Sequence, residues 1–344
     1  MNSIDYIGLD IHKKTISFCA KAQDGTICDE GTIAARRSEL SVWAKERPRR
    51  WVGAMEATLF TGWIYDHLKP LAEELKVAHP AMLKAIAASK KKNDKVDARK
   101  IADLLRCNLL PECYMAPSAM RDLRRVLRYR NLVVRQATRM KNRIAGLLME
   151  TGTPYNKERL HGKAYFGELF GSLQETPPSV RELLQVSRSQ LEFFETIQKR
   201  LLQELSAHAE LRERVERLQS IRGVGAVLAL TWALEVGEVE RFGSIAEACS
   251  YGGLTSAQNS SAGKEQRGPI SKQRNKHLQA MLIEAAKLAP RYNLQLAVVH
   301  ERELQRGDRN QATLAVARKL VAYLMAVDKS GKPFAMRASG EEAA

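Results

Sequence analysis

The chain has 344 residues, 44% of them hydrophobic, which is enough for two domains with buried cores and a connector. Its 55 Lys and Arg against 39 Asp and Glu give a charge of +16, which indicates a polyanionic partner, usually nucleic acid. The five cysteines have no Cys-x-x-Cys spacing, so we expect neither disulfides nor a structural zinc site. No apolar run could span a membrane and no signal peptide is visible, so we expect a cytoplasmic, nucleoid-associated protein without a membrane partner.

Strands come first along the chain. Residues 4–32 are β-rich, with a turn signal at Asp24-Gly25. The elements that follow are a helix at about 36–48, a strand at 51–55, a helix at 59–73, a strand at 75–78 and a helix at about 81–108. This order predicts a mixed α/β sheet, and three antiparallel strands followed by helix–strand units is the layout of the ribonuclease-H-like fold.

The character of the chain changes after Pro117. A strongly periodic helix is predicted over 121–148, with an apolar stripe of Val126, Tyr129, Val133, Ala137, Met140, Ile144 and Leu148. A second long helix is predicted from Pro177-Pro178 to about 218, with a stripe of Leu184, Leu191, Phe194, Ile197, Leu201 and Leu205. Two such helices predict a coiled-coil connector, antiparallel or dimerising.

The last part of the chain is predicted to be mostly helical, with one Gly/Ser-rich stretch. Ile221-Arg222-Gly223-Val224-Gly225 before an apolar helix has the form of a helix-hairpin-helix turn, or of a simple tight turn. The expected domains are 1–116, a 117–218 connector, 219–328 and a disordered tail at 329–344.

The first of the long helices is strongly basic. Only Asp122 opposes its cations, which are Arg121, Arg124, Arg125, Arg128, Arg130, Arg135, Arg139, Lys141 and Arg143. A solvated helix face usually carries charges of both signs. We therefore expect this helix to bind a nucleic-acid backbone, with Arg124, Arg125, Arg128, Arg135, Arg139, Lys141 and Arg143 as the contacts.

Acidic residues recur where strands end and where a helix begins. Asp10 ends an apolar strand, and Glu56 ends a second one. Asp94 and Asp97 share a helix face among cations. A carboxylate at the end of a buried strand destabilises the fold unless a cation or a hydrogen-bond donor binds it. Clustered carboxylates are suitable ligands for Mg²⁺ or Mn²⁺. A pair of such ions can activate a nucleophile and stabilise the leaving oxygen in phosphodiester cleavage.

These motifs carry a family resemblance. The chain resembles the insertion-sequence one-ten family, the "DEDD" transposases, in Ile7-Gly8-Leu9-Asp10-Ile11-His12-Lys13, Met55-Glu56-Ala57-Thr58, His79-Pro80 and Lys92-Asn93-Asp94-Lys95-Val96-Asp97-Ala98-Arg99. The resemblance implies a Holliday-junction-resolvase-like first domain in which Asp10, Glu56, Asp94 and Asp97 are the metal-site acids. It also implies DNA and a structured, element-encoded guide RNA as partners.

The same resemblance implies a serine nucleophile in the last domain, near Asn259-Ser260-Ser261-Ala262-Gly263-Lys264. Ser261 is the first choice and Ser260 the alternate, and the carboxylate site could activate either if the domains meet. Lys264, Arg267 and Lys272 would then contact phosphates. The expected enzyme is a DNA transposase or site-specific recombinase, acting as a homodimer or homotetramer.

Several alternatives stay open. A DNA invertase could use the same scaffold, and a resolvase-like nuclease would need only the first domain. Ile7-Gly8-Leu9-Asp10 also resembles the first phosphate loop of sugar kinases and actin-like ATPases, although Ile11-His12-Lys13-Lys14 lacks the glycines that such a loop needs. An architectural nucleic-acid-binding protein is a further possibility, which strand cleavage would exclude.

Overall fold

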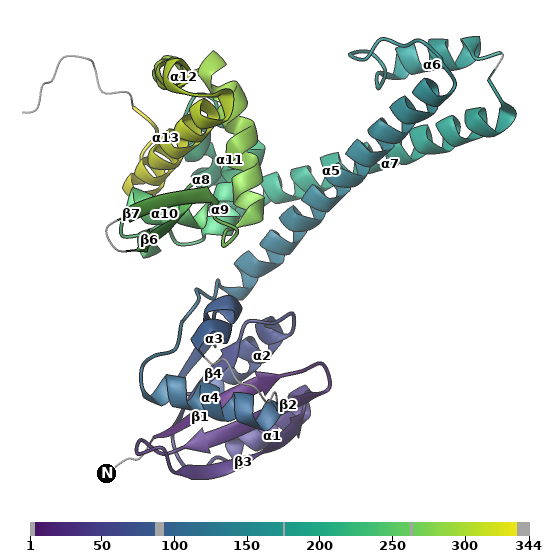
Figure 1. Cartoon of the computed structure of the whole chain (residues 1–344). Coiled ribbons are helices and arrows are strands. Elements are labelled where there is room, and N and C mark those ends of the chain that lie inside the picture. Colours follow the sequence, from purple (N-terminus) through teal and green to yellow (C-terminus); the bar gives the residue numbers. More distant parts are fainter. Residues whose placement is uncertain (1–3, 87–92, 175, 262–263, 336–344) are drawn as a thin grey trace, which may run out of the picture. The chain divides into compact units, whose positions relative to one another are not determined.

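Figure 1 shows the chain as a computed structural model, which describes residues 4–86, 93–174, 176–261 and 264–335, and describes no side chains within 258–267. Two compact units make up the chain, Met1–Ser118 and Ala119–Ala344. The division falls at 118, close to the expected end of the first domain at 116. The expected boundaries at 218 and 328 stay predictions.

The first unit contains a five-stranded sheet of order β3-β2-β1-β4-β5. Its strands are β1 (Asp5–Ile11), β2 (Thr15–Lys21), β3 (Ile27–Ala34), β4 (Trp51–Glu56) and β5 (Glu74–Ala78). The first three are antiparallel, whereas β4 runs parallel to β1 and β5 parallel to β4. The predicted strands and the mixed α/β sheet are confirmed, and Gly25 supplies the positive φ, +94°, of the predicted turn.

Helices cover both faces of this sheet (Figure 1). They are α1 (Arg37–Lys45), α2 (Thr61–Leu68), the 3-10 turn η1 (Lys69–Leu71), α3 (Pro80–Ile86) and α4 (Asp94–Arg106). The predicted helix at 81–108 is therefore two helices, and the residues between them lie outside the described part of the chain.

Side chains along β1 alternate between two hydrophobic cores, one on each face of the sheet. Ile7, Leu9 and Ile11 belong to the core that also contains Trp43 and Leu68. Tyr6 packs instead on the core that contains Ala54, Ile101 and Leu105, on the face covered by α4. Because side chains alternate along a strand, Gly8 and Asp10 share the α4 face with Tyr6.

Helix α4 lies directly against the backbone of β1. A Cβ on Gly8 would stand 2.1 Å from the carbonyl oxygen of Ala98 and 2.5 Å from the amide nitrogen of Ala102. Only glycine allows this close approach. The first turn of α4 consequently lies near the end of β1.

The second unit begins with a helical arm, which consists of α5 (Ser118–Glu150), α6 (Lys163–Ser172) and α7 (Pro178–Ala207). Ala137, Ile144 and Leu148 of α5 share a core with Leu184 and Leu191 of α7. The predicted stripe of α5 is wrong at Tyr129, which is exposed, while Leu127 and Arg130 are buried. Pairing of this arm as a coiled coil stays a prediction.

The predicted second long helix is in fact two helices. Backbone dihedral angles of φ −69° and ψ 115° at His208 end α7 and start α8 (Ala209–Gln219). An extended residue at this point stops the i to i−4 hydrogen-bond ladder, so the helix cannot continue through it. Apolar periodicity alone did not reveal the break.

The rest of the second unit is mostly helical, as expected. Its elements are α9 (Ala226–Val236), η2 (Val239–Arg241), α10 (Ile245–Tyr251), β6 (Ser256–Ser261), β7 (Lys264–Ile270), α11 (Lys276–Leu288), η3 (Ala289–Arg291), α12 (Leu294–Arg306) and α13 (Arg309–Ser330). The fully buried Trp232 lies in their common core. The Gly/Ser-rich stretch forms the antiparallel hairpin β6–β7, which was not predicted.

Part of the expected disordered tail is packed. The rings of Phe334 and Tyr323 lie 4.8 Å apart, and the amide of Phe334 donates to Ser220 Oγ at 2.7 Å. The expectation of disorder is therefore wrong for 329–335, and residues 336–344 lie outside the description. Among the described residues, no helix has the length and apolar character needed to cross a membrane.

Candidate metal centre and nucleic-acid interface

Asp10 and Glu56 end two neighbouring parallel strands. The register pairs Leu9 of β1 with Met55 of β4, so the two acids follow at the same edge of the sheet. Glu56 has the same alternation as Ala54, which lies in the core on the α4 face. Both acids are partly buried, and the Asp10 side chain is 14% exposed.

The other two predicted acids lie in the first turn of α4. Asn93 caps this helix, because its side-chain oxygen accepts the Lys95 amide at 3.1 Å. Asp94 and Asp97 follow the cap, where the positive end of the helix dipole favours carboxylates. Asp97 also lies 3.6 Å from the ammonium of Lys100.

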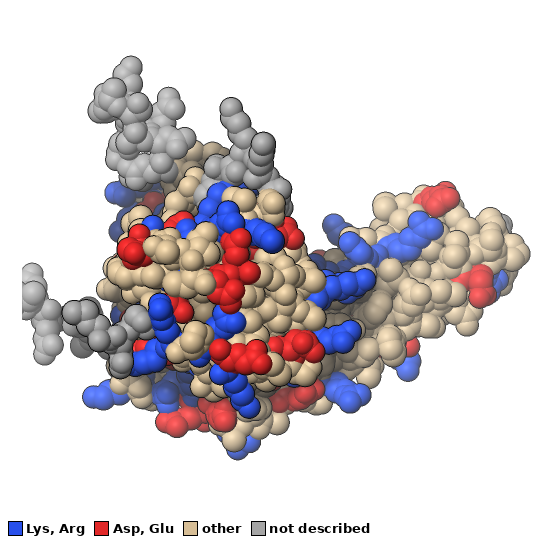
Figure 2. Space-filling model, turned by 90° about the horizontal axis from the view of Figure 1, so that it is seen from below, with Lys and Arg blue, Asp and Glu red and all other residues tan. Residues whose placement is uncertain are grey.

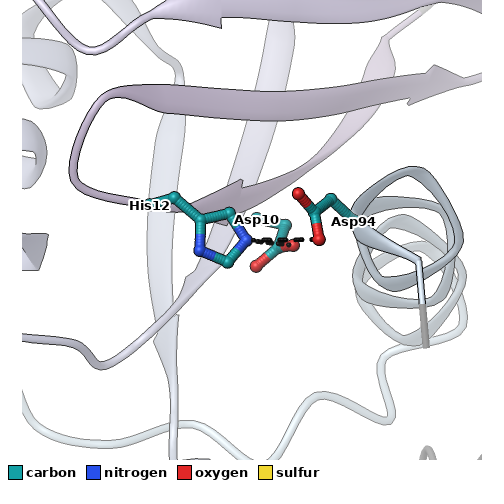
Figure 3. Close-up of side chains that lie close together, drawn as sticks. All are labelled: Asp10, His12 and Asp94. Carbon is teal, nitrogen blue, oxygen red and sulfur yellow. Dashed lines mark hydrogen bonds and ion pairs between the residues drawn. The ribbon is translucent and has the colours of Figure 1, made fainter.

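Three side chains converge at the end of β1 (Figure 3). The Nε2 atom of His12 lies 3.2 Å from Oδ2 of Asp10 and 3.4 Å from Oδ1 of Asp94. One ligand atom from each residue lies within 4.8 Å of the others, a spacing that could hold a metal ion. Neither Glu56 nor Asp97 belongs to this described group.

The electrostatics of the site favour a bound cation. Burial raises the pKa of Asp10, the charge of His12 opposes this rise, and the negative charges of Asp94 and Asp97 add to it. Burial and two neighbouring acids therefore disfavour the charged form of Asp10, and a bound cation would offset both effects. Carboxylate oxygens are the donors that Mg²⁺ and Mn²⁺ prefer, so the donor set fits such an ion.

The structure brings two of the four predicted acids into one group, and the role of all four as metal ligands stays a prediction. Asp10 and Asp94 come together, Glu56 lies at the adjacent strand end on the same face, and Asp97 is close enough to raise the pKa of Asp10. His12 was not predicted as a site residue. Its signal was present in the sequence, because residues two apart at a strand end point to the same face.

The serine segment is described only in its backbone. Ser261 pairs with Lys264, and Ser260 pairs with Glu265, at the closed end of the β6–β7 hairpin. The side chains of Ser260, Ser261, Lys264 and Arg267 lie outside the description, and Lys272 is exposed. A nucleophile at either serine stays a prediction.

Two cations of α5 that were predicted to bind nucleic acid have partners inside the protein. Arg128 binds both carboxylate oxygens of Glu235, with Nε and Nη2 each donating at 2.8 Å. Arg124 donates from Nε to the carbonyl oxygen of Leu234 at 2.8 Å. Both guanidinium groups therefore have partners within the second unit, and their contact with nucleic acid stays a prediction.

Other cations of α5 remain at the surface. Arg125 forms an exposed ion pair with Asp122 at 2.9 Å, and Lys141 lies 3.1 Å from Glu195. Among the residues that the structure describes, the exposed members that form no ion pair are Arg135, Arg139 and Arg143. Figure 2 shows Lys and Arg side chains along the helical arm. The candidate nucleic-acid surface is thus narrower than the sequence suggested.

The predicted glycine turn joins α8 to α9. Gly223 has a φ of +98°, and a Cβ there would stand 2.8 Å from the Cβ of Ala289. The glycine therefore serves packing within the unit, whereas Gly225 has open space around it. Phosphate binding at this turn stays a prediction.

Comparisons with known proteins give two family matches along the chain. Residues 7–153 match a family model for DEDD transposases of the IS110 type, described as "Transposase". Residues 215–300 match a model described as "Transposase IS116/IS110/IS902 family". One match covers the carboxylate site and α5, and the other covers the part from α8 to α12.

The chain is also similar over nearly its whole length to curated proteins. A "Probable family 20 transposase" of Pseudomonas aeruginosa is 25% identical, over 94% of this chain and 97% of the relative. The "Transposase for insertion sequence element IS1111A" of Coxiella burnetii is 27% identical, over 95% and 90%. The "Transposase for insertion sequence element IS1328" of Yersinia enterocolitica is 24% identical, over 97% and 99%.

Proposed function

The chain belongs to the IS110 family of insertion-sequence transposases, and from that premise we propose that it cuts and rejoins DNA with a divalent-metal carboxylate site and a serine nucleophile. The observation that carries the proposal is the convergence of Asp10 and Asp94, from elements far apart in the sequence, on one cluster of ligand atoms.

The first unit is proposed to have the ribonuclease-H-like fold. Three antiparallel strands followed by two parallel ones, in the order β3-β2-β1-β4-β5, support this assignment. In this fold the acids belong at the ends of the central strands and on the following helix. Asp10, Glu56 and the first turn of α4 occupy those positions.

Asp10 and Asp94 would hold a Mg²⁺ or Mn²⁺ ion, with Glu56 and Asp97 as further ligands. Such an ion, when bound, supplies a Lewis acid that stabilises the charge that develops during phosphodiester cleavage. His12 would keep Asp10 and Asp94 oriented, because its Nε2 lies within reach of both carboxylates. The negative charge of the cluster supports this proposal.

Ser261, or alternatively Ser260, would attack the scissile phosphate. Its oxygen forms the new bond to phosphorus and gives up its proton, while the bond to the leaving oxygen breaks and that oxygen takes a proton. The strand then stays covalently attached, and its bond energy is conserved for rejoining. Lys264, Arg267 and Lys272 would contact the neighbouring phosphates, and a salt-dependent affinity is expected from such contacts.

Exposed cations of α5 would bind nucleic-acid backbone, with Arg135, Arg139 and Arg143 as the leading contacts. Arg125 and Lys141 could join them by exchanging an exposed acid for a phosphate, because surface ion pairs are weak. The proposed partners are the DNA of the element ends and target and a structured guide RNA. The proposed assembly is a homodimer or homotetramer paired through the helical arm.

A recombination assay with native flanking DNA tests this function. Asp10→Ala is expected to abolish cleavage, and the pair Ser260→Ala and Ser261→Ala is expected to abolish the covalent protein–DNA adduct. Chelation should stop the reaction and added Mg²⁺ should restore it. Glu39→Gln, at an exposed acid of α1, is the matched control and should react as the wild type does.

The same assay separates the proposed enzyme from a nuclease. Cleavage that persists without both serines would overturn the nucleophile and leave a resolvase-like nuclease. Cleavage that persists in Asp10→Ala would overturn the metal site.

A further inference from the structure

The second unit contains a completely buried acid. Glu235 lies in α9 with a side chain that is 0% exposed, among apolar residues such as Trp232 and Leu234. A charge in such a place is strongly destabilising unless hydrogen bonds and opposite charges satisfy it. The groups that satisfy it come from several different elements, and they show what the acid does.

The long helix α5 provides the first partner of Glu235. Arg128 holds the carboxylate through two parallel hydrogen bonds of 2.8 Å. This bidentate geometry is the strongest form of an arginine–carboxylate pair. Arg128 is nevertheless 45% exposed, so one edge of its guanidinium holds Glu235 while the side chain still reaches the surface of α5.

The two ends of the hairpin segment, residues 252–274, provide the other partners. Asn275, immediately after this segment, donates from Nδ2 to Oε2 of Glu235 at 2.8 Å. Tyr251, immediately before it, donates from its hydroxyl to the main-chain oxygen of Glu235 at 2.8 Å. Residue 235 therefore holds both ends of the segment that carries β6 and β7.

The two ends are also joined to each other. The main-chain N–H of Asn275 donates to the carbonyl oxygen of Tyr251 at 2.9 Å, and its side-chain Nδ2 donates to the Tyr251 hydroxyl at 3.1 Å. Asn275 Oδ1 accepts the amides of His277 and Leu278, which starts α11. The base of the hairpin is consequently a closed hydrogen-bonded ring on Glu235.

We propose that Glu235 is a positioning residue, which joins the nucleic-acid-binding helix α5, through Arg128, to the base of the β6–β7 hairpin and so orients the serine-bearing strand. This inference rests on the proposed function, because it needs a reacting serine in β6. It assigns to Glu235 no contact with DNA.

The ionisation state of Glu235 fits this role. Burial by itself raises the pKa of the carboxyl group, but the hydrogen bonds from Arg128 and Asn275 and the charges of Arg128 and Arg124 outweigh it and lower the pKa. Glu235 is therefore an anion at neutral pH. An anion binds both Arg128 and Asn275 more strongly than a neutral amide could.

The same unit offers a matched control. Arg214 binds Asp328 through two hydrogen bonds, 2.7 Å from Nε and 2.6 Å from Nη2, and the Asp328 side chain is 4% exposed. This pair is as buried and as bidentate as the Glu235 pair. The pair also binds Trp232, Ala233 and Gly237, none of which belongs to the hairpin base.

The experiment compares Glu235→Gln and Tyr251→Phe with Asp328→Asn in the full-length protein. The readouts are affinity for native flanking DNA, the rate of covalent adduct formation on that DNA, and amide exchange in β6 and β7. We expect Glu235→Gln to slow adduct formation by about 10–100-fold, the range found when a partner that orients a metal ligand is lost. Affinity should change by less than about threefold, because contacts with phosphates set most of it.

The milder and control variants keep the test decisive if Glu235→Gln folds poorly. Tyr251→Phe removes one hydroxyl and retains its ring contacts with Phe242 and Arg241, and it should slow the adduct by about fivefold, the cost of one hydrogen bond. Both variants should speed amide exchange in β6 and β7. Asp328→Asn should lower thermal stability without changing either the adduct rate or the exchange of the hairpin.

Each outcome decides a different point. Adduct rates equal to the wild type in Glu235→Gln and Tyr251→Phe would overturn the positioning role alone. An equal slowing in Asp328→Asn would reduce that role to general stability and also overturn it. An adduct that survives the loss of Ser260 and Ser261 would overturn the proposed function and this inference together.

Discussion

Asp10 near the end of β1 is partly buried and Glu235 in the last turn of α9 is fully buried, and the two carboxylates differ in the charges that surround them. Asp10 has acidic neighbours and one histidine, and its pKa is raised, first by burial. Glu235 has a bidentate arginine and an asparagine, and its pKa is lowered although burial opposes this. The comparison teaches that a buried acid marks a candidate ligand site only when the protein leaves its charge uncompensated.

The largest expected difference between the two acids is in catalysis. Asp10→Asn should reduce DNA cleavage by far more than the about 10–100-fold that loss of an orienting partner costs, because a proposed metal ligand is removed. Cleavage of labelled flanking DNA over time measures this effect. If Asp10→Asn and Glu235→Gln cleave equally fast, the distinction between a ligand and a positioning acid fails.

Stability should depend strongly on the buried Glu235 and only weakly on an exposed acid. Glu235→Ala should lower the free energy of unfolding of the second unit by about 3 kcal/mol, because it leaves Arg128 without its anion. Denaturant unfolding followed by Trp232 fluorescence measures the change. Glu213→Ala removes an ion pair with Arg217 whose acid is 88% exposed, and it should cost less than about 0.5 kcal/mol. Similar losses of stability in Glu235→Ala and Glu213→Ala would contradict the burial of Glu235 in the structure.

Added metal should distinguish the two regions further. At a Mg²⁺ concentration about tenfold above the dissociation constant, the first unit should gain about 1.4 kcal/mol of stability by mass action. Thermal melts with and without Mg²⁺ measure this gain. The gain should disappear in Asp10→Asn and persist in Glu235→Gln, whereas a gain that persists in Asp10→Asn would place the ion elsewhere.

The two acids should also give the protein opposite responses to pH. The lowered pKa of Glu235 means that its stabilisation is present above its ordinary value of 4.5 and is lost as pH falls through the lowered pKa. The raised pKa of Asp10 means that ionisation costs stability, a cost that appears as pH rises from 3.8 through the raised pKa. Unfolding curves across this acidic range, for wild type, Glu235→Gln and metal-free Asp10→Asn, measure both slopes. If the contributions of Glu235 and Asp10 to stability change with pH in the same direction, the environment inferred for one of these acids is wrong.

Much of the first unit could be predicted from the sequence, for a physical reason. Short apolar runs at 6–10 and 51–55 indicate buried strands, and an acid at the end of each run is visible without any tertiary information. The Asn93 cap and the acids behind it likewise depend on residues a few positions apart. The arrangement of Asp10, Glu56 and Asp94 follows from these local patterns together with parallel pairing.

The second unit was less predictable because its decisive contacts are distant in sequence. Arg128 and Glu235 are separated by 107 residues, so the charge pattern of α5 could not reveal that this arginine is already paired. The break at His208 and the packed Phe334 depend in the same way on what the folded chain brings against them.

Local periodicity and spacing thus determined the sheet, the basic helix and the candidate ligands of this protein. The tertiary structure decided which charges are compensated, because a charge is neutralised by the groups that surround it in space and not by its neighbours along the chain.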